Sequence, residues 1–304
     1  MKRNIHADLH NHTTASDGDF SPETMIIRAK ACGIRAVAVT DHDTVSGIPE
    51  ALDAGIRHGI TVIPGVEVSV RFKRPVFTGT LHLLCYFPTR RLNDTVFMKA
   101  LQDTLGKGRG EPLVMARVAE INRCFGPDST KPLLARSMTA QDIIGYGTTL
   151  SRRHFALALG QKHNVQDQAT INAIIGNKSP AYVPSGIDLA DVATFIRTYP
   201  MVTVLAHPAA GSFTGPGHYR EVLPPVETVE TFLPELIEAG LDGLEVHYPG
   251  HTNEHQEMLL SWAGRHSLIV TGGSDCHDES TRPPGVAGMT RDEFKVFMAL
   301  LTSR

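Results

Sequence analysis

The feature that most constrains the fold is a short apolar run, residues 5–9, that ends in two histidines two positions apart and then an aspartate. In an extended strand, residues i and i+2 point to the same side, so His10 and His12 can reach one cation together. Asp17, carried around the turn that Gly18 allows, can reach a second position nearby. The stretch predicts a strand that delivers metal ligands at its carboxyl end, although such a pair alone is also compatible with solvent-facing histidines.

The same pattern recurs along the chain, because later strand-like apolar runs also carry His, Asp or Glu. Residues 34–40 form a nearly continuous apolar run, which is typical of a strand buried on both faces in a parallel sheet. Asp41-His42-Asp43 follows directly. The other expected strands, with the ligand-type residues that they carry or precede, are 60–66 with Glu67, 79–86 with His82, 201–206 with His207, 242–246, and 268–273 with Asp275 and His277.

Helical segments separate these strands and favour an α/β fold of the barrel type, with seven strands in alternation. Ser21 is a good N-cap, Pro22 a good first residue, and Gly33 a good stop for the first helix. Further helices are expected at 48–58, after a capping Asp188, and at 227–239, 253–265 and 291–301.

The middle of the chain has few strand signals and reads as an insertion. Helices are expected there at 94–105, 111–125, 151–163 and 167–175. We therefore predict a barrel domain formed by residues 1–87 and 185–304, and a mostly helical insertion domain formed by residues 88–184.

Composition narrows the class of protein. With 304 residues, 41% hydrophobic and 20% charged, the chain is typical of a soluble globular protein, and a cytoplasmic enzyme is expected. No apolar stretch approaches 18 residues, so no membrane partner is expected. A net charge of −3 without a basic run argues against long nucleic acid as a partner, while it allows a short oligonucleotide in a metal-lined pocket. The four cysteines are widely spaced, which suggests neither disulfides nor a thiolate zinc site.

Nine side chains at or within the strand ends form a candidate metal cluster. Imidazole and carboxylate without thiolate suit manganese, iron or zinc and leave the metal open. Any one of these histidines could instead pair with a backbone carbonyl. Burying all nine near one barrel mouth without cations would leave uncompensated charge. The predicted ligands are His10, His12, Asp17, His42, Glu67, His82, His207, Asp275 and His277.

Five motifs, in order, resemble those of the PHP (polymerase and histidinol phosphatase) family of metal-dependent phosphoesterases. They are His10-Asn11-His12 with Ser16-Asp17-Gly18, Thr40-Asp41-His42-Asp43, Gly65-Val66-Glu67, His207-Pro208 and Gly273-Ser274-Asp275-Cys276-His277. The likeness covers nearly the whole chain outside 88–150. It is greatest to stand-alone bacterial members with a helical insertion, which include 3′,5′-nucleotide bisphosphate phosphatases.

The resemblance implies a distorted (β/α)7 barrel that holds two to three divalent metal ions. By position, it implies that Glu67 bridges two ions. It places one ion on His10, His12, Glu67 and Asp275, a second on Glu67, His82 and His207, and a third on Asp17, His42 and His277.

The resemblance further implies hydrolysis of a small phosphomonoester by attack of a metal-bound hydroxide on phosphorus. The expected substrate is a nucleotide, a nucleoside 3′,5′-bisphosphate, or a related sugar or cyclic phosphate. Ser151-Arg152-Arg153-His154 is similar to a Ser-Arg-x-His segment that supplies phosphate-binding groups, so Arg152 and His154 are expected phosphate contacts, although such a helix start is more often a solvated face. Asp43 or His247 is a candidate general acid, and Asp43 could equally orient the histidine ligands.

Three alternatives remain beside this hypothesis. A metal-dependent amidohydrolase acting on a C–N or C–O bond can use a barrel with an H-x-H start, because fold alone does not settle function. A 5′-3′ exonuclease acting on short oligonucleotides would use the same cluster. A non-catalytic metal-binding or nucleic-acid module is disfavoured by the intact ligand set. The oligomeric state is left open.

Overall fold

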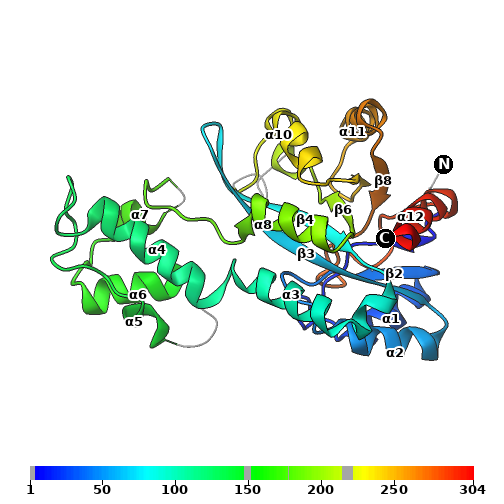
Figure 1. Cartoon of the computed structure of the whole chain (residues 1–304), viewed down its shortest axis with the longest axis horizontal. Helices are drawn as coiled ribbons and strands as arrows, with labels where there is room; N and C mark the ends of the chain where they lie inside the picture. Colours follow the sequence, from blue (N-terminus) through cyan, green and yellow to red (C-terminus); the bar gives the residue numbers. More distant parts are fainter. Residues whose placement is uncertain (1–3, 147–151, 177, 214–221) are drawn as a thin grey trace. The chain divides into compact units, whose positions relative to one another are not determined.

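The computed structural model describes residues 4–146, 152–176, 178–213 and 222–304, and within the second range it describes side chains from residue 154 onward. The chain forms two compact units (Figure 1). The barrel unit comprises Met1–Leu105 and Asp188–Arg304, and the helical unit comprises Gly106–Ile187.

The barrel unit is built on a single sheet. Its strands are β1 Ala7–Asp8, β2 Ala36–Val39, β3 Thr61–Arg74, β4 Phe77–Tyr86, β5 Ile187–Asp188, β6 Val202–Leu205, β7 Gly243–His247 and β8 Ile269–Gly272. They lie in the order β1-β2-β3-β4-β6-β7-β8, with β5 paired to β3. Along the order from β1 to β8, neighbours are parallel except β3–β4 and β4–β6, which are antiparallel. Each of the seven predicted strands is therefore present.

Backbone hydrogen bonds bring the two ends of the sheet together. Leu9 N–H donates to the carbonyl of Gly272 over 3.2 Å, and the N–H of Asp275 donates to the carbonyl of His10 over 2.8 Å. His12 N–H continues this line with a 2.9 Å bond to the next residue, Cys276. The sheet is therefore nearly closed, and the predicted distorted barrel is confirmed.

The fourth strand departs from strict strand and helix alternation. A turn at residues 75–76 joins β3 directly to β4, and two strands joined so closely must run antiparallel. β3 also continues to Arg74, beyond its predicted end. His82 pairs with Ser69 in this hairpin, so it lies inside a strand, as predicted, but that strand is antiparallel to β3.

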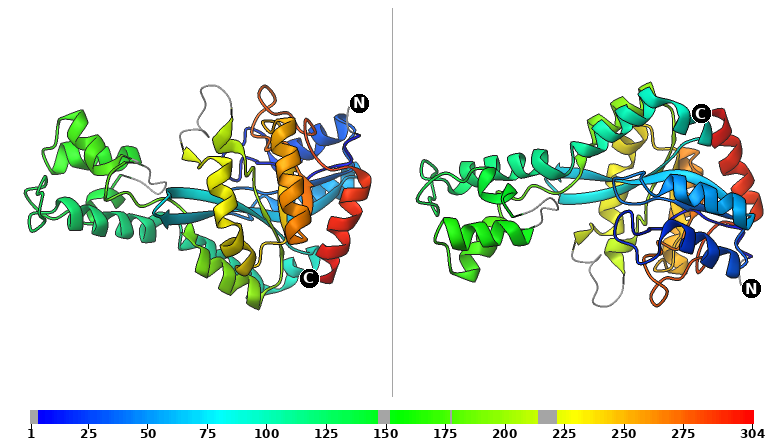
Figure 2. Two further views of the ribbon diagram at one scale, coloured as in Figure 1. Left: turned by 90° about the horizontal axis from the view of Figure 1, so that it is seen from above. Right: turned by 90° about the horizontal axis from the view of Figure 1, so that it is seen from below.

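Helices surround the sheet. They are α1 Pro22–Ala31, α2 Ile48–His58, α3 Thr95–Gly106, α8 Leu189–Thr198, α10 Val226–Glu238, α11 Asn253–His266 and α12 Arg291–Ser303, with short 3-10 turns η1 Thr89–Asn93 and η2 Ala210–Ser212. α2 packs on β3, α11 packs on β7 and β8, and α12 packs on β8. Figure 2 shows these helices from two further sides. No helix among the described residues is long and apolar enough to cross a membrane.

Local sequence explains several of these helix ends. The Ser21 hydroxyl accepts a 3.2 Å hydrogen bond from the N–H of Thr24 at the start of α1, as expected of an N-cap. Gly59 ends α2 with a left-handed φ of 70°, which glycine adopts without steric cost. Asp188 precedes α8 as predicted, but its carboxylate lies 3.2 Å from Arg71 Nε and makes no capping bond.

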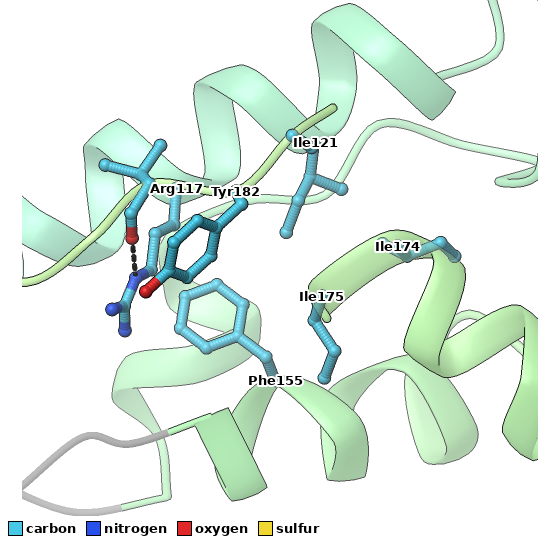
Figure 3. Close-up of a pocket in the computed structure, with 8 residues that line it drawn as sticks. Arg117, Ile121, Phe155, Ile174, Ile175 and Tyr182 are labelled. Atoms are coloured by element: carbon cyan, nitrogen blue, oxygen red, sulfur yellow. Dashed lines mark hydrogen bonds between the residues drawn. The ribbon is translucent and has the colours of Figure 1, made fainter. Parts of the chain in front are cut away.

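The helical unit contains α4 Gly110–Phe125, α5 Gln141–Ile144, α6 Arg152–Lys162 and α7 Gln168–Ile175. These helices share an apolar core that includes Ile121, Phe155 and Ile174. Figure 3 shows a small cavity beside this core, lined by these side chains and by Arg117 and Tyr182. Its volume of about 30 Å³ has room for about two water molecules, so it is too small for a nucleotide.

The predicted insertion and the helical unit begin at different residues. Phe97 of α3 is fully buried, and its ring centroid lies 5.2 Å from that of Phe87 and 5.9 Å from that of Phe195. Because these aromatic contacts hold α3 on the barrel, residues 88–105 belong to the barrel unit and not to the insertion predicted to start at 88.

Candidate metal centre

The predicted ligands come together at one end of the barrel. Three groups each have ligand atoms within 4.8 Å of one another. The groups are His10, His12, Glu67 and Asp275; His12, Asp17, His42 and His277; and His42, Glu67 and His82. His207 joins the last group, because its Nε2 lies 3.3 Å from Glu67 Oε1 and 3.4 Å from His82 Nδ1.

Glu67 lies at the centre of this arrangement. It is the first residue of β3 beyond the predicted strand, and only 1% of it is exposed. Oε1 faces His82 Nδ1 at 3.0 Å and His207 Nε2 at 3.3 Å. Oε2 faces His10 Nε2 at 3.3 Å and His12 Nε2 at 3.1 Å. The two oxygens of one buried carboxylate thus face two different sets of histidines.

Asp275, which follows β8 at the other end of the sheet, faces the same pair of histidines. Its Oδ1 lies 3.4 Å from His10 Nε2 and 3.1 Å from His12 Nε2. Its Oδ2 accepts a 2.8 Å hydrogen bond from the Tyr248 hydroxyl and also contacts the guanidinium of Arg282. Asp275 therefore presents a single oxygen to the histidines.

The third group lies nearer the surface. Asp17, whose side chain is 56% exposed, has carboxylate oxygens 3.6 Å from His12 Nδ1, 3.8 Å from His42 Nε2 and 3.5 Å from His277 Nε2. His12 presents its other ring nitrogen, Nε2, to Glu67 and Asp275. The imidazole of His12 therefore stands between two groups of donor atoms.

The donor atoms fit divalent cations. Ligand atoms bound to one ion at about 2.0–2.2 Å lie about 3–3.6 Å from one another, which matches most of the separations found here. Among the described side chains, Glu67 Oε2, His12 Nδ1 and His42 Nδ1 are buried without a hydrogen-bond partner. Buried polar atoms that face one another without a proton between them are costly, and a shared cation removes this cost.

The electrostatics of the site favour positive charge. Burial disfavours the charged form of His12, but Asp275 and Glu67 outweigh it and raise the pKa of His12 to about 9. Burial also opposes charge on Glu67, yet neighbouring histidines, chiefly His42 and His82, hold its pKa well below the usual range. The metal-free cluster thus holds protons where cations would be held.

Three residues of the site have a left-handed backbone, which is costly for side chains other than glycine. They are Asp43 with φ 50°, His207 with φ 31° and Asp275 with φ 52°. Each backbone N–H donates to a neighbouring residue: that of Asp43 to the Glu67 carbonyl at 3.0 Å, that of His207 to the carboxylate of Glu245 at 2.8 Å, and that of Asp275 to the His10 carbonyl. The surrounding structure therefore imposes these conformations.

The proposed catalytic residues lie in different surroundings. Asp43 lies beside the cluster, and its Oδ1 accepts a 2.7 Å bond from the N–H of Ser69, the residue paired with His82. This contact favours the orienting role for Asp43. His247 is 5% exposed, and its Nε2 lies 3.0 Å from Glu293 Oε1 in α12. The described polar contact of its side chain is to that helix, and no contact with the nine ligands is found among the described residues.

The segment predicted to bind phosphate belongs to the helical unit. His154 is half-buried in α6, and its ring centroid is 6.1 Å from that of Tyr146. Ser151 and the side chains of Arg152 and Arg153 lie outside the described residues. The roles of Arg152 and His154 stay predictions.

Several buried polar residues that support the ligands were not identified from the sequence. Glu245, on β7, lies 3.0 Å from His10 Nδ1. Asp8, on β1, accepts bonds from the N–H and hydroxyl of Ser274 at 2.9 and 2.7 Å. Asp41 accepts bonds from Thr13 and Ser16 and so shapes the loop that carries Asp17. An acidic residue inside an otherwise apolar strand was the available signal for Asp8 and Glu245.

Comparisons with known proteins agree with this site. A family model described as the PHP domain matches residues 8–149. The chain is 30% identical over 277 residues to a 5′-3′ exoribonuclease of Haemophilus influenzae, with 89% of each chain covered. It is 28% identical over 282 residues to a 3′,5′-nucleoside bisphosphate phosphatase of Chromobacterium violaceum, with 89% of this chain and 86% of the relative covered.

A solved structure supports the same relationship. A protein of Bifidobacterium adolescentis, named provisionally as a metal-dependent phosphoesterase, matches with a TM-score of 0.63 at 27% identity and 99% coverage of both chains. Fold, donor set and sequence thus point to one group of proteins. The chain belongs to the PHP family and is a metal-dependent hydrolase of phosphoric esters.

Proposed function

We propose that the chain hydrolyses a small nucleotide-like phosphomonoester, with a nucleoside 3′,5′-bisphosphate as the preferred substrate class. The observation that carries this proposal is Glu67, whose two oxygens face two separate sets of histidines. Such a bridging carboxylate holds two cations close together, and paired cations are suited to in-line displacement at phosphorus. The similarity to the bisphosphate phosphatase of Chromobacterium violaceum supports the substrate class.

The nine predicted side chains are proposed as the ligands of two to three manganese, iron or zinc ions. The first ion would use His10, His12, Glu67 and Asp275, the second Glu67, His82 and His207, and the third Asp17, His42 and His277. Bound ions would activate a water molecule and stabilise charge on the phosphoryl oxygens. Three divalent ions with the carboxylates of Asp17, Glu67 and Asp275 leave a net charge of about +3, which suits a phosphate dianion.

Residues of the chain itself then bind and orient the substrate. Arg152 is proposed to donate a bidentate pair of hydrogen bonds to the phosphoryl group, and His154 a further one. Asp43 is proposed to hold Ser69 and thereby the strand register that directs His82 toward Glu67. His247 has no part in this mechanism, because its partner is Glu293. We also propose that the protein acts in the cytoplasm.

A second candidate is a 5′-3′ exonuclease acting on short oligonucleotides. The relative from Haemophilus influenzae that bears this name favours it. The net charge of −3 argues against binding of a long phosphate backbone, so the oligonucleotide would have to be short. An amidohydrolase acting on a C–N or C–O bond receives no support from these relatives.

A substrate panel tests the proposal. With protein of known metal content, phosphate release is measured on nucleoside 5′-, 3′- and 3′,5′-phosphates and sugar phosphates. On cyclic phosphates and short 5′-phosphorylated oligonucleotides, the ring-opened monoester and the released nucleotides are measured instead, because cleavage of a phosphodiester frees no inorganic phosphate. We expect the highest kcat/KM with a nucleoside 3′,5′-bisphosphate. Higher kcat/KM with oligonucleotides would favour the exonuclease, and hydrolysis of amides or lactones without phosphate release would contradict the proposal.

A further inference from the structure

A fully buried carboxylate lies behind the metal centre and belongs to none of the three groups of donors. Glu245 is the middle residue of β7, Gly243–His247, in which all five residues are buried. Burying a carboxylate is costly unless hydrogen bonds satisfy its oxygens. Glu245 has such partners on two sides: His10 Nδ1, which lies 3.0 Å from Oε1 and 3.2 Å from Oε2, and the backbone N–H of His207, 2.8 Å from Oε2.

The first contact fixes the proton on His10. An ionised carboxylate only accepts hydrogen bonds, so the hydrogen of the neutral imidazole must lie on Nδ1. Nε2 then presents its lone pair to the space it shares with Glu67 Oε2 at 3.3 Å and Asp275 Oδ1 at 3.4 Å. Glu245 therefore selects the tautomer of His10 that can bind a cation.

The second contact fixes the backbone of His207. This residue has a φ of 31°, a conformation that costs energy outside glycine and persists only where neighbours hold it. The bond to Glu245 holds its N–H at 2.8 Å. The His207 side chain then reaches Glu67 Oε1, whereas His10 faces Oε2 of the same carboxylate.

We propose that Glu245 is a positioning residue that couples the two ions sharing Glu67, by setting the tautomer of His10 for one ion and the backbone of His207 for the other. The inference rests on the proposed ligand set. Glu245 is not itself a ligand, because its two oxygens are directed at His10 Nδ1 and at the backbone of His207. One side chain thereby fixes ligands that follow two different strands of the barrel, β1 and β6.

Two substitutions separate the two contacts. In Glu245→Gln, the amide oxygen should stay on the His207 N–H, because two N–H groups cannot face each other there. The amide nitrogen then faces His10 Nδ1 and favours the tautomer with its hydrogen on Nε2, which blocks the cation. Glu245→Met has a similar length and removes both acceptors. Glu235→Gln is the matched control, because Glu235 lies on α10 and pairs with Arg74.

The readout is the pair of stepwise Mn²⁺ dissociation constants of the full-length chain, measured by calorimetry without substrate. His82→Ala, which removes a ligand only from the second ion, identifies which constant belongs to which ion. Loss of a partner behind a ligand weakens metal binding about tenfold to a hundredfold. We expect that loss for the first ion alone in Glu245→Gln, for both ions in Glu245→Met, and for neither ion in Glu235→Gln.

Other results would overturn the inference. If the dissociation constant of the first ion in Glu245→Gln lies within threefold of the wild-type value, Glu245 does not set the tautomer of His10. This variant is decisive even if Glu245→Met does not fold. A change of melting temperature in the metal-free variants with both constants unchanged would reduce Glu245 to a structural residue. A wild-type chain that binds no Mn²⁺ would instead contradict the proposed function, so the two failures are distinguishable.

Discussion

Replacement of Glu67 is the perturbation with the largest effect that the site predicts. In Glu67→Ala the second ion would keep only two neutral nitrogen donors, from His82 and His207. The first ion would keep three donors, from His10, His12 and Asp275. Two neutral ligands do not hold a divalent ion that ordinarily takes at least four, whereas three ligands with one carboxylate retain it weakly. The bound metal should therefore fall by more than one equivalent, and turnover should be abolished.

The size of the loss follows from the geometry. Loss of a group behind a ligand costs about tenfold to a hundredfold in affinity, and loss of a ligand itself costs more. Glu67 contacts both sets of histidines at 3.0–3.3 Å, so both affinities should fall by more than about a hundredfold. Glu67→Gln, which preserves the volume of the side chain, should behave in the same way if charge and ligation are the cause.

Elemental analysis after reconstitution and gel filtration measures this effect, with phosphate release recorded on the same samples. Glu235→Ala, a substitution of a surface carboxylate on α10, should keep full metal content and activity. Full metal occupancy in Glu67→Ala would refute the bridging role.

Four further outcomes are expected. Arg152→Met should lose about a hundredfold to a thousandfold in kcat/KM, or about 3–4 kcal/mol, with its metals retained, and Arg152→Lys should recover only part of the loss; steady-state kinetics within about threefold of wild type would remove Arg152 from the mechanism. Metal-free His10 and His12 both have a raised pKa, about 9 for His12, and both must release a proton to bind metal. Metal affinity should therefore rise by at least about tenfold per pH unit below pH 9, and calorimetry that finds no proton release would contradict this. The same raised pKa stabilises the metal-free fold below pH 6.5, and this stability should be lost as the pH rises through 9. His247 and His251 lie outside the nine proposed ligands; Nδ1 of His251 lies 2.9 Å from the carbonyl of Val246. His247→Ala and His251→Ala should therefore keep full metal content by elemental analysis, and loss of an ion from either variant would mean that the proposed ligand set is wrong.

Strand and helix signals in the sequence were sufficient for the barrel. The continuous apolar run at 34–40 became β2, buried on both faces, and Ile48–His58 became α2 at the predicted residues. The direction of β4 could not be predicted from the sequence, because the periodicity of a strand does not depend on its orientation in the sheet. The start of the helical unit was misplaced for a similar reason: α3 looks helical from sequence, and only its aromatic contacts assign it to the barrel.

The ligands of the site were easier to find than the residues that support them. His10 and His12 can be recognised by their spacing at a strand end, and Glu67 by its place after an apolar run. Glu245 carries no such spacing, and its role depends on Nδ1 of His10, which lies 235 positions away in the chain. Contacts of that kind follow from barrel closure and cannot be read from local pattern. His247 illustrates the converse, because a histidine at a strand end proved to pair with α12.

The most direct test of the central claim is phosphate release measured while metal is returned to metal-free protein. Bound Mn²⁺ per chain and initial rate on a nucleoside 3′,5′-bisphosphate are determined on the same samples. We expect no phosphate release without metal, and we expect phosphate release to begin as the second ion binds. Undiminished release by the metal-free chain, or a fully loaded chain that releases phosphate from none of the phosphomonoesters, would contradict it.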